Sequence, residues 1–281
     1  MDNTNPSSTQ LSMIIRFGVL ALMLTIVTGA VWTALLIINL QANPTIPWAP
    51  AVMAIFLWLL WLYLVGRWPF SKISPARQGH LRARPVTGSV FIWAIAAGGF
   101  SIVSLAGFWI VLIQLVSVRG NVLPDYSKYP LSTVILVVGI ASLVTSVVEE
   151  AGFRGYFQSV LEPKVGGPLA ILIMAFVIAP AHGLTQGFAW PTLLFYFLVD
   201  AMFGWMAYLT DSILPGLTIH FMGLLIFFSL IWPYDPTRHL ISAGGTNIQF
   251  WLSIAQTFIF AVLSMMAFRR LVKITRHLPA R

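Results

Sequence analysis

The chain has 281 residues, of which 58% are hydrophobic and only 9% are charged, and its mean hydropathy is +0.88. This composition excludes most water-soluble folds and makes an integral membrane protein the leading class. The net charge of +8 does not indicate nucleic-acid binding, because the lysine and arginine residues lie in loops beside apolar segments, where they are the ordinary signal of membrane topology.

Long apolar segments follow one another along the chain. A membrane-spanning helix needs about 20 apolar residues to cross about 30 Å of hydrocarbon. The apolar runs are continuous instead of alternating, which favours helices over a β-barrel. We therefore predict an all-α, polytopic helical membrane bundle with about eight transmembrane helices, at residues 12–40, 47–66, 89–118, 131–151, 167–188, 190–210, 212–233 and 248–268.

The basic residues of the loops predict the orientation. They concentrate in the connection 67–87 and in the tail after residue 268. If the N-terminus is cytosolic and the eight spans alternate, only Arg119, Lys128 and Arg238 of the 16 basic residues lie outside. Cytosolic loops carry the excess of lysine and arginine. We predict an integral protein of the plasma (inner) membrane with both termini in the cytosol.

The sequence predicts one membrane domain over residues 1–281. It contains no cysteine, which excludes a thiol nucleophile and cysteine-based metal sites. The chemistry is therefore expected to come from ionisable side chains at membrane depth. Such side chains cost roughly 2.5 to 3.5 kcal/mol each on insertion scales, so they are functional candidates.

Two adjacent carboxylates end the fourth predicted span. The stretch VVEEAGFRGY places Glu149, Glu150 and Arg154 directly after a long apolar run. On a helix, Glu150 and Arg154 share a face, with the acid nearer to the N-terminus, which is the favourable order. Glu149 points about 100° away from Glu150 and is not committed to that pair. We predict that Arg154 neutralises and orients Glu150, whereas Glu149 faces the bundle interior and transfers protons.

Three further ionisable residues lie inside later spans. His182 and His220 each lie in an otherwise apolar stretch of the fifth and the seventh span, and Asp200 lies near the middle of the sixth. A single buried histidine is more often a structural hydrogen bonder than a catalyst, and the Glu-Glu-Arg motif alone could be an interfacial charge cluster. The two histidines together with that motif favour a catalytic site. We expect Asp200 to face inward and to pair with Arg154, a histidine or water, in a supporting role.

Three motifs follow one another on the fourth, fifth and seventh spans. They are EEAGFR (Glu149–Arg154), IAPAHG with His182, and DSILPGLTIHFMGL with His220. These stretches resemble the EExxxR, FxxxH and HxxxN signatures of the CPBP intramembrane proteases. That family includes the type II CAAX prenyl endopeptidases and bacteriocin-processing or immunity homologues. The resemblance covers about residues 140–228.

The resemblance implies an endopeptidase that hydrolyses a peptide bond within the membrane. By their places in the motifs, Glu149 and His182 activate a water molecule. Glu150 and Arg154 form a supporting pair, and His220 stabilises the tetrahedral intermediate. The residue types agree with these roles independently, because peptide hydrolysis needs a general base, a water and an oxyanion donor. The predicted partners are membrane lipid and a peptide or protein substrate. Because the family includes proteases of prenylated proteins, the substrate can be lipidated. Nucleic acid is not a predicted partner.

Two positions depart from the motifs of the family. Ile178 stands where the family has phenylalanine, four residues before His182, and this is a mild change of packing. Leu224 stands where the family has asparagine, four residues after His220. A leucine cannot donate a hydrogen bond to a developing oxyanion, and the loss of one such donor can cost about 10²- to 10³-fold in rate. Leu224 therefore predicts a slow enzyme or one that is assisted differently.

Other interpretations use the same residues. Our first interpretation requires no cofactor, and a zinc enzyme with Glu149, His182 and His220 as ligands is the alternative, since two histidines and a glutamate are a common catalytic zinc set. The alternative function is a catalytically silent membrane scaffold or a bacteriocin-immunity protein of the same fold, which Leu224 favours. A small-solute or proton transporter would also bury such residues, but transporters often have inverted repeats, and we find none in the sequence.

Overall fold

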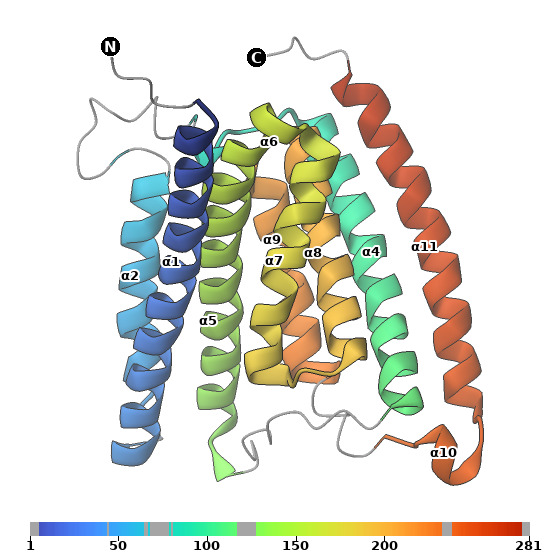
Figure 1. Ribbon diagram of the computed structural model, residues 1–281. Helices are drawn as coiled ribbons and strands as arrows, with labels where there is room; N and C mark the ends of the chain where they lie inside the picture. The colour runs from blue at the N-terminus through green and yellow to red at the C-terminus, as the bar shows by residue number, and fades with distance from the viewer. Residues whose placement is uncertain are drawn as a thin grey trace. The chain divides into compact units, whose positions relative to one another are not determined.

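The computed structural model describes residues 6–43, 45–64, 67, 79, 81–116, 128–231 and 238–276. These residues are almost entirely helical and include no strand (Figure 1). The predicted all-α class is therefore confirmed. Its physical reason is that a helix satisfies its own backbone hydrogen bonds where no water is present to do so.

The helices follow the predicted spans in order. Each of the eight predicted segments falls on a helix, and two of them end in π-helical turns, η3 and η4. The elements are α1 (Pro6–Ala42), α2 (Trp48–Leu64), α4 (Gly88–Leu115), α5 (Leu131–Glu149), η3 (Glu150–Gln158), α6 (Ser159–Val165), α7 (Gly167–Gln186), α8 (Trp190–Thr210), α9 (Leu214–Ile226), η4 (Phe227–Ile231), α10 (Ile241–Gly244) and α11 (Ile248–Thr275).

Helix length separates the predicted spans into two groups. Within the described part of the chain, six apolar helices are long enough to cross a membrane: Ile14–Ala42, Gly88–Leu115, Leu131–Val165, Trp190–Thr210, Leu214–Ile231 and Ile248–Thr275. The second and fifth predicted spans are shorter apolar helices, Trp48–Tyr63 and Gly167–Gly183. The polytopic helical membrane bundle is confirmed, whereas the number of eight spans stays a prediction.

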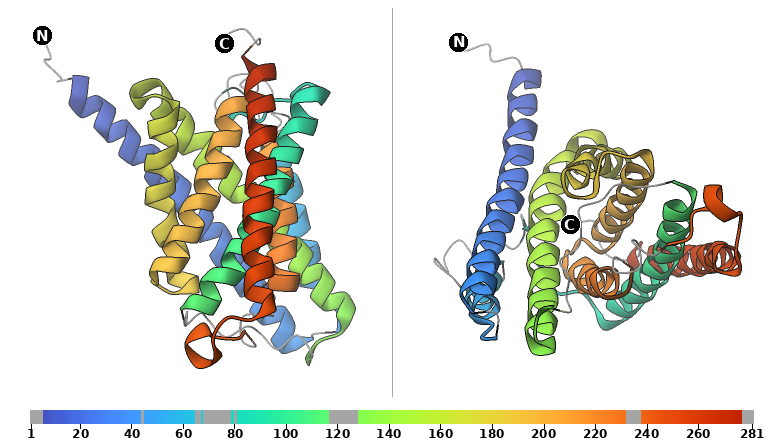
Figure 2. Two further views of the ribbon diagram at one scale, coloured as in Figure 1. Left: turned by 90° about the vertical axis from the view of Figure 1, so that its right-hand side faces the viewer. Right: turned by 90° about the horizontal axis from the view of Figure 1, so that it is seen from below.

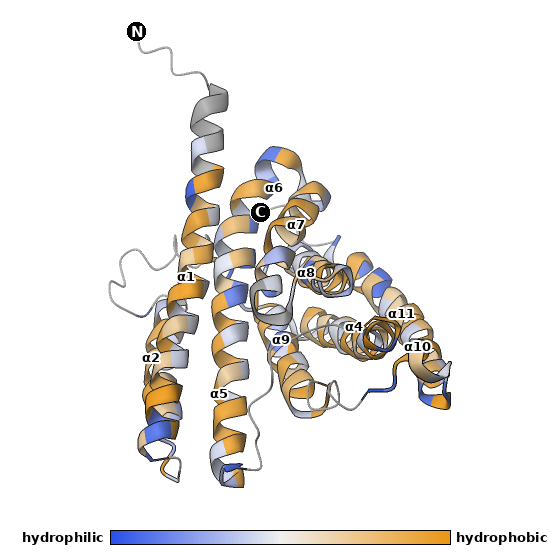
Figure 3. Cartoon of the chain, turned by 60° about the horizontal axis from the view of Figure 1, so that its bottom comes forward, coloured by the Kyte–Doolittle hydropathy of each residue, from blue (hydrophilic) through white to orange (hydrophobic). Residues whose placement is uncertain are grey.

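Most residues of the helices are hydrophobic (Figure 3). Large hydrophobic side chains are exposed along them, among them Ile26 at 58%, Trp58 at 60% and Phe258 at 69%. Exposed apolar surface on this scale is unfavourable in water and favourable in lipid. The protein is therefore an integral membrane protein.

The chain divides into two compact units. The first comprises Met1–Arg84 and Ser127–Ala170, and the second comprises Pro85–Tyr126 and Ile171–Arg281. Each unit has buried residues of its own. The single membrane domain over residues 1–281 stays a prediction.

In the first unit, α1 and α2 pack against each other and against α5, and α1 also packs against η3. The buried side chain of Asn39 ties the α1–α2 connection together. Its amide nitrogen donates to the carbonyl oxygens of Asn43 and Ile46, each at 2.9 Å, and its amide oxygen accepts from the N–H of Ala49 at 2.8 Å. All three bonds are local, so this connection is stabilised by its own residues.

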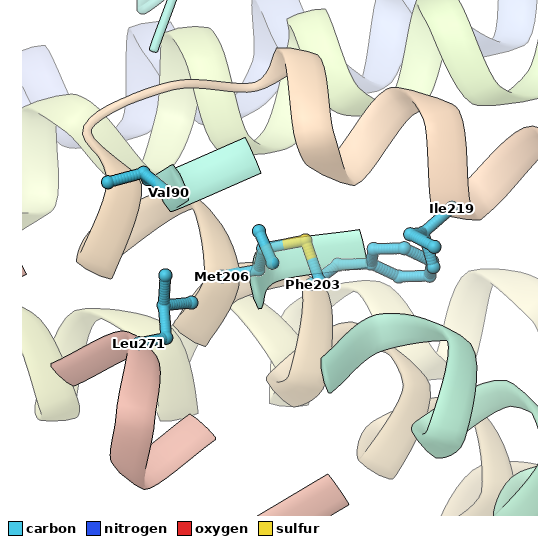
Figure 4. Packing of buried hydrophobic residues seen from close by; sticks show 6 residues of the cluster. Val90, Phe203, Met206, Ile219 and Leu271 are labelled. Atoms are coloured by element: carbon cyan, nitrogen blue, oxygen red, sulfur yellow. The ribbon is translucent and has the colours of Figure 1, made fainter. Parts of the chain in front are cut away.

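In the second unit, α4 packs against α8, α9 and α11, and α11 lies along α4 (Figure 2). Figure 4 shows one core cluster of this unit, in which side chains of four helices meet, namely Val90, Phe203, Met206, Ile219 and Leu271. Small residues allow α4 and α11 to approach closely. Ser101 and Ser264 share a hydrogen bond of 2.7 Å between the two helices. Small and hydroxylated residues at helix contacts are typical of membrane bundles.

Candidate active site

The helix that carries the two adjacent carboxylates changes its winding at that point. The α-helix α5 ends at Glu149, and η3, a π-helix, begins at Glu150 and ends at Gln158. A π-helix is rare and is found frequently at functional sites. The motif residues Glu150 and Arg154 therefore both lie on an unusual segment of the backbone.

The glycines of the same segment allow neighbouring backbone to come close. A Cβ added to Gly155 would lie 2.8 Å from the carbonyl oxygen of Leu81, and one added to Gly152 would lie 3.3 Å from that of Ala21. A residue with a side chain could not occupy position 155 without a shift of the facing backbone. The glycines thus let η3 lie directly against its neighbours in the first unit.

Glu150 and Arg154 form the ion pair expected from their spacing. Nη1 of Arg154 lies 3.4 Å from Oε1 of Glu150, and both side chains are fully buried. Removing one partner of a buried pair costs about 3–5 kcal/mol, because the remaining charge has no water around it. The pairing therefore allows both charges to stay in the interior of the first unit.

Glu149 is buried next to this pair, with an exposed fraction of 7%. The ion pair of Arg154 is made with Glu150, as the helical spacing predicts. The structure therefore contains two neighbouring carboxylates, one of which faces the guanidinium of Arg154. The role of Glu149 as proton acceptor stays a prediction.

His182 and Asp200 come together in the second unit. Nε2 of His182 on α7 lies 3.9 Å from Oδ2 of Asp200 on α8, a separation that is too long for a direct hydrogen bond. The ring of Tyr196 stacks on the imidazole, with the centroids 3.8 Å apart and the planes 6° apart. The side chain of His182 is 21% exposed and that of Asp200 is 2% exposed. The carboxylate and the stacked ring together restrict the orientation of the imidazole.

His220 lies on α9 and is 6% exposed. Its ring stacks on Phe203 of α8, with the centroids 4.5 Å apart and the planes 24° apart. Leu224, at the position of the family asparagine, follows one turn later on α9 and is partly buried. Ile178, at the position of the family phenylalanine, is 1% exposed on α7, so it is a packing residue.

The predicted residues divide between the two units. Glu149, Glu150 and Arg154 belong to the first unit, and His182, Asp200 and His220 belong to the second. Within the units, the structure brings Glu150 to Arg154 and His182 to Asp200. The convergence of Glu149, His182 and His220 on one water molecule stays a prediction.

The described residues do not provide a three-ligand metal site inside either unit, because no three His, Asp or Glu side chains there could hold a metal ion together. A catalytic zinc ion ordinarily has three protein ligands. The zinc set of Glu149, His182 and His220 draws on both units and stays a prediction.

Sequence reasoning missed two features of the site. Tyr196 could have been found, because it precedes Asp200 by four residues and shares its face of α8. The ion pair of Arg82 with Glu162, close to the end of η3, has no local sequence signal, since its partners are 80 positions apart. In the sequence, Arg82 is one of the basic residues of the connection 67–87 and indicates topology alone.

One comparison with known proteins matches this part of the chain. The family described as type II CAAX prenyl endopeptidase Rce1-like matches residues 131–226. No curated protein and no solved structure matches the chain. The matched segment contains every predicted site residue, namely Glu149, Glu150, Arg154, His182, Asp200 and His220. The resemblance indicated by the three short motifs is therefore confirmed.

Proposed function

We infer that this chain, whose residues 131–226 belong to the type II CAAX prenyl endopeptidase Rce1-like family, hydrolyses a peptide bond within the membrane with a glutamate- and histidine-activated water. At the level of the family, it is an intramembrane endopeptidase of the CAAX-protease type that acts on a peptide or protein. The burial of Glu149 next to the fully buried Glu150–Arg154 pair, inside the matched segment, carries the finer proposal.

The proposed reaction begins with a proton transfer. Glu149 accepts a proton from a water molecule that His182 positions, and the water oxygen forms a bond to the carbonyl carbon of the peptide. The electron pair of the carbonyl π bond moves to its oxygen, which accepts a hydrogen bond from His220. The C–N bond then breaks as Glu149 returns the proton to the leaving nitrogen. The electron pair on the oxyanion re-forms the carbonyl as that bond breaks, so the products are a carboxylic acid and an amine, which exchange a proton to become a carboxylate and an ammonium group.

Arg154, Asp200 and Tyr196 support the groups that carry out the proposed reaction. Arg154 pairs with Glu150, and the proposal assigns the proton transfer to Glu149, the neighbouring carboxylate. Oδ2 of Asp200 lies 3.9 Å from Nε2 of His182, and the ring of Tyr196 stacks on the imidazole with the centroids 3.8 Å apart. Both residues support the orientation of the imidazole toward the water. A ring that is held in place does not have to be ordered during the reaction.

The test is hydrolysis of a peptide library, including prenylated peptides, by the purified full-length chain. We expect cleavage by the wild type, a loss of about 10²- to 10⁴-fold for Glu149→Gln and for His182→Ala, and no effect of a chelator. The matched control is Asp211→Asn, at the start of the third motif, a carboxylate to which the proposed reaction assigns no role and whose left-handed backbone, with φ of 47°, asparagine tolerates. Equal cleavage by all these proteins would remove Glu149 and His182 from the mechanism, and inhibition by the chelator would favour the zinc alternative.

The second candidate function is a catalytically silent scaffold or immunity protein of the same fold. Leu224 favours it, because an apolar side chain stands one helical turn after His220, where the family has a hydrogen-bond donor. The same library distinguishes the two functions. A silent protein would bind peptides without cleaving them, and Glu149→Gln would leave the binding unchanged.

A further inference from the structure

A second ion pair of the first unit lies outside the motifs of the family. Arg82, in the segment before α4, donates two hydrogen bonds to Glu162 of α6, from Nη1 to Oε1 at 2.8 Å and from Nη2 to Oε2. The side chains are only 10% and 11% exposed, so salt and water screen the pair little. Bidentate pairs of arginine and carboxylate are among the strongest hydrogen-bonded contacts in proteins. This pair joins two segments that are distant in the sequence.

The contact continues to the end of η3. Nε2 of Gln158 donates to Oε1 of Glu162 at 2.7 Å, and Gln158 is fully buried. Gln158 is the last residue of η3. Glu162 therefore accepts hydrogen bonds from both Arg82 and Gln158, and three side chains connect the segment before α4 to the π-helix.

The backbone at Arg82 is unusual in a way that fits this contact. Arg82 has a φ of 53°, in the left-handed region that non-glycine residues rarely adopt. The preceding residue, Leu81, is fully buried, and its carbonyl oxygen lies against Gly155 of η3. Such a conformation persists only where the surrounding structure determines it, and such residues cluster at functional sites. Residues 81 and 82 are held at two points, Gly155 and Glu162.

The π-helical winding of η3 needs stabilising contacts from neighbouring residues. A π-helix is rarer than an α-helix and mostly appears as a single turn inside one. A return to α-helical winding would rotate Glu150 and Arg154 relative to the residues that follow them. Contacts at the end of η3, such as those of Gln158 with Glu162, oppose that change.

We propose that Arg82 and Glu162 are positioning residues that hold η3 in its π-helical register, and thereby hold Glu149 and the Glu150–Arg154 pair in place for hydrolysis. The catalytic consequence rests on the proposed function, whereas the register of η3 does not. Both residues act through η3 and do not touch the reacting atoms.

The experiment compares four variants of the full-length chain. Arg82→Gln and Glu162→Gln each remove one charge of the pair, and Glu162→Gln is the milder change because an amide can still accept and donate hydrogen bonds. The double variant Arg82→Glu with Glu162→Arg restores an ion pair in which the two charges have changed places. Arg84→Gln is the matched control, since Arg84 lies in the same segment and donates to the carbonyl oxygen of Gly79 at 3.3 Å.

Two measurements are made on each variant. Hydrogen–deuterium exchange of the amides of residues 150–158 reports how firmly the backbone hydrogen bonds of η3 are held, with residues 190–205 of α8 as the internal reference for folding. In both single variants we expect exchange at 150–158 to be faster by about tenfold or more. We expect kcat to fall about tenfold to a hundredfold with KM nearly unchanged, because η3 is misplaced but substrate contacts are kept. The double variant restores the slow amide exchange and kcat at least in part, and Arg84→Gln changes neither.

Unchanged exchange at residues 150–158 in the single variants, with α8 still protected, would overturn the proposal. Faster exchange with an unchanged kcat would overturn the positioning role. A wild-type chain that cleaves no peptide would contradict the proposed function alone, and the exchange data would still decide whether Arg82 and Glu162 hold η3.

Discussion

At the level of single residues, the fully buried pair of Glu150 and Arg154 shows why the spacing of the motif matters. Their side chains can meet only because four positions separate them on one helical segment, and the contact of 3.4 Å follows from that spacing. Glu149, one position earlier, is also buried, but its position on the helix does not bring it to the same guanidinium. Adjacent residues of the same chemical type are therefore expected to have different functions.

The substitution Leu224→Asn is the sharpest test at this scale. If the enzyme lacks an oxyanion donor at that position, an amide there should raise kcat, by up to about 10²- to 10³-fold, with little change in KM. Steady-state hydrolysis of a peptide that the wild type cleaves slowly measures the effect. The matched control is Leu224→Met, which keeps an apolar side chain of similar volume and should leave kcat unchanged. A fall or no change in kcat for the asparagine variant would show that position 224 does not act on the oxyanion.

At the level of elements, the close packing of η3 against its neighbours depends on glycines, which have no side chain. Gly155 lies so close to Leu81 that a Cβ would be 2.8 Å from a backbone oxygen, and backbone yields less easily than a flexible side chain. The winding of η3 itself could not be predicted, because α- and π-helices differ in hydrogen-bond register and not in the apolar pattern of the residues. The glycines of this segment have no side chain and are therefore compatible with such a close approach.

Gly155→Ala should therefore destabilise the first unit. We expect a loss of about 1–3 kcal/mol in the free energy of unfolding, as is typical when a side chain is forced into a packed contact, together with a lower kcat. Thermal unfolding of the purified protein, followed by helical circular dichroism, measures it. Gly139→Ala on α5 is the control, because its added Cβ would meet no atom within 4 Å beyond its chain neighbours and the backbone of its own helix, and alanine favours the helix. Equal melting temperatures for the two variants would contradict the close contact at Gly155.

At the level of the whole molecule, the distribution of basic residues predicts the orientation in the membrane. The chain has no cysteine, so single cysteines can report it without background. A membrane-impermeant thiol reagent applied to intact cells should label Lys128→Cys and Ser242→Cys and should leave Thr87→Cys and Arg276→Cys unlabelled. All four side chains are exposed, so access to the reagent depends on the side of the membrane. The opposite labelling pattern would mean that the termini are not cytosolic.

The sequence by itself determined the all-α membrane class, the resemblance of residues 131–226 to the type II CAAX prenyl endopeptidase Rce1-like family, and the contact of Glu150 with Arg154. These follow from composition, from short motifs and from helical spacing, which are local properties of the chain. It also limited Asp200 to a few partners, among them a histidine, but it could not choose His182 or foresee the stacked ring of Tyr196. The tertiary structure decided those contacts, the pair of Arg82 with Glu162 and the π-helical winding of η3. Each of them depends on packing between segments that are distant in the sequence or on a hydrogen-bond register that composition does not encode.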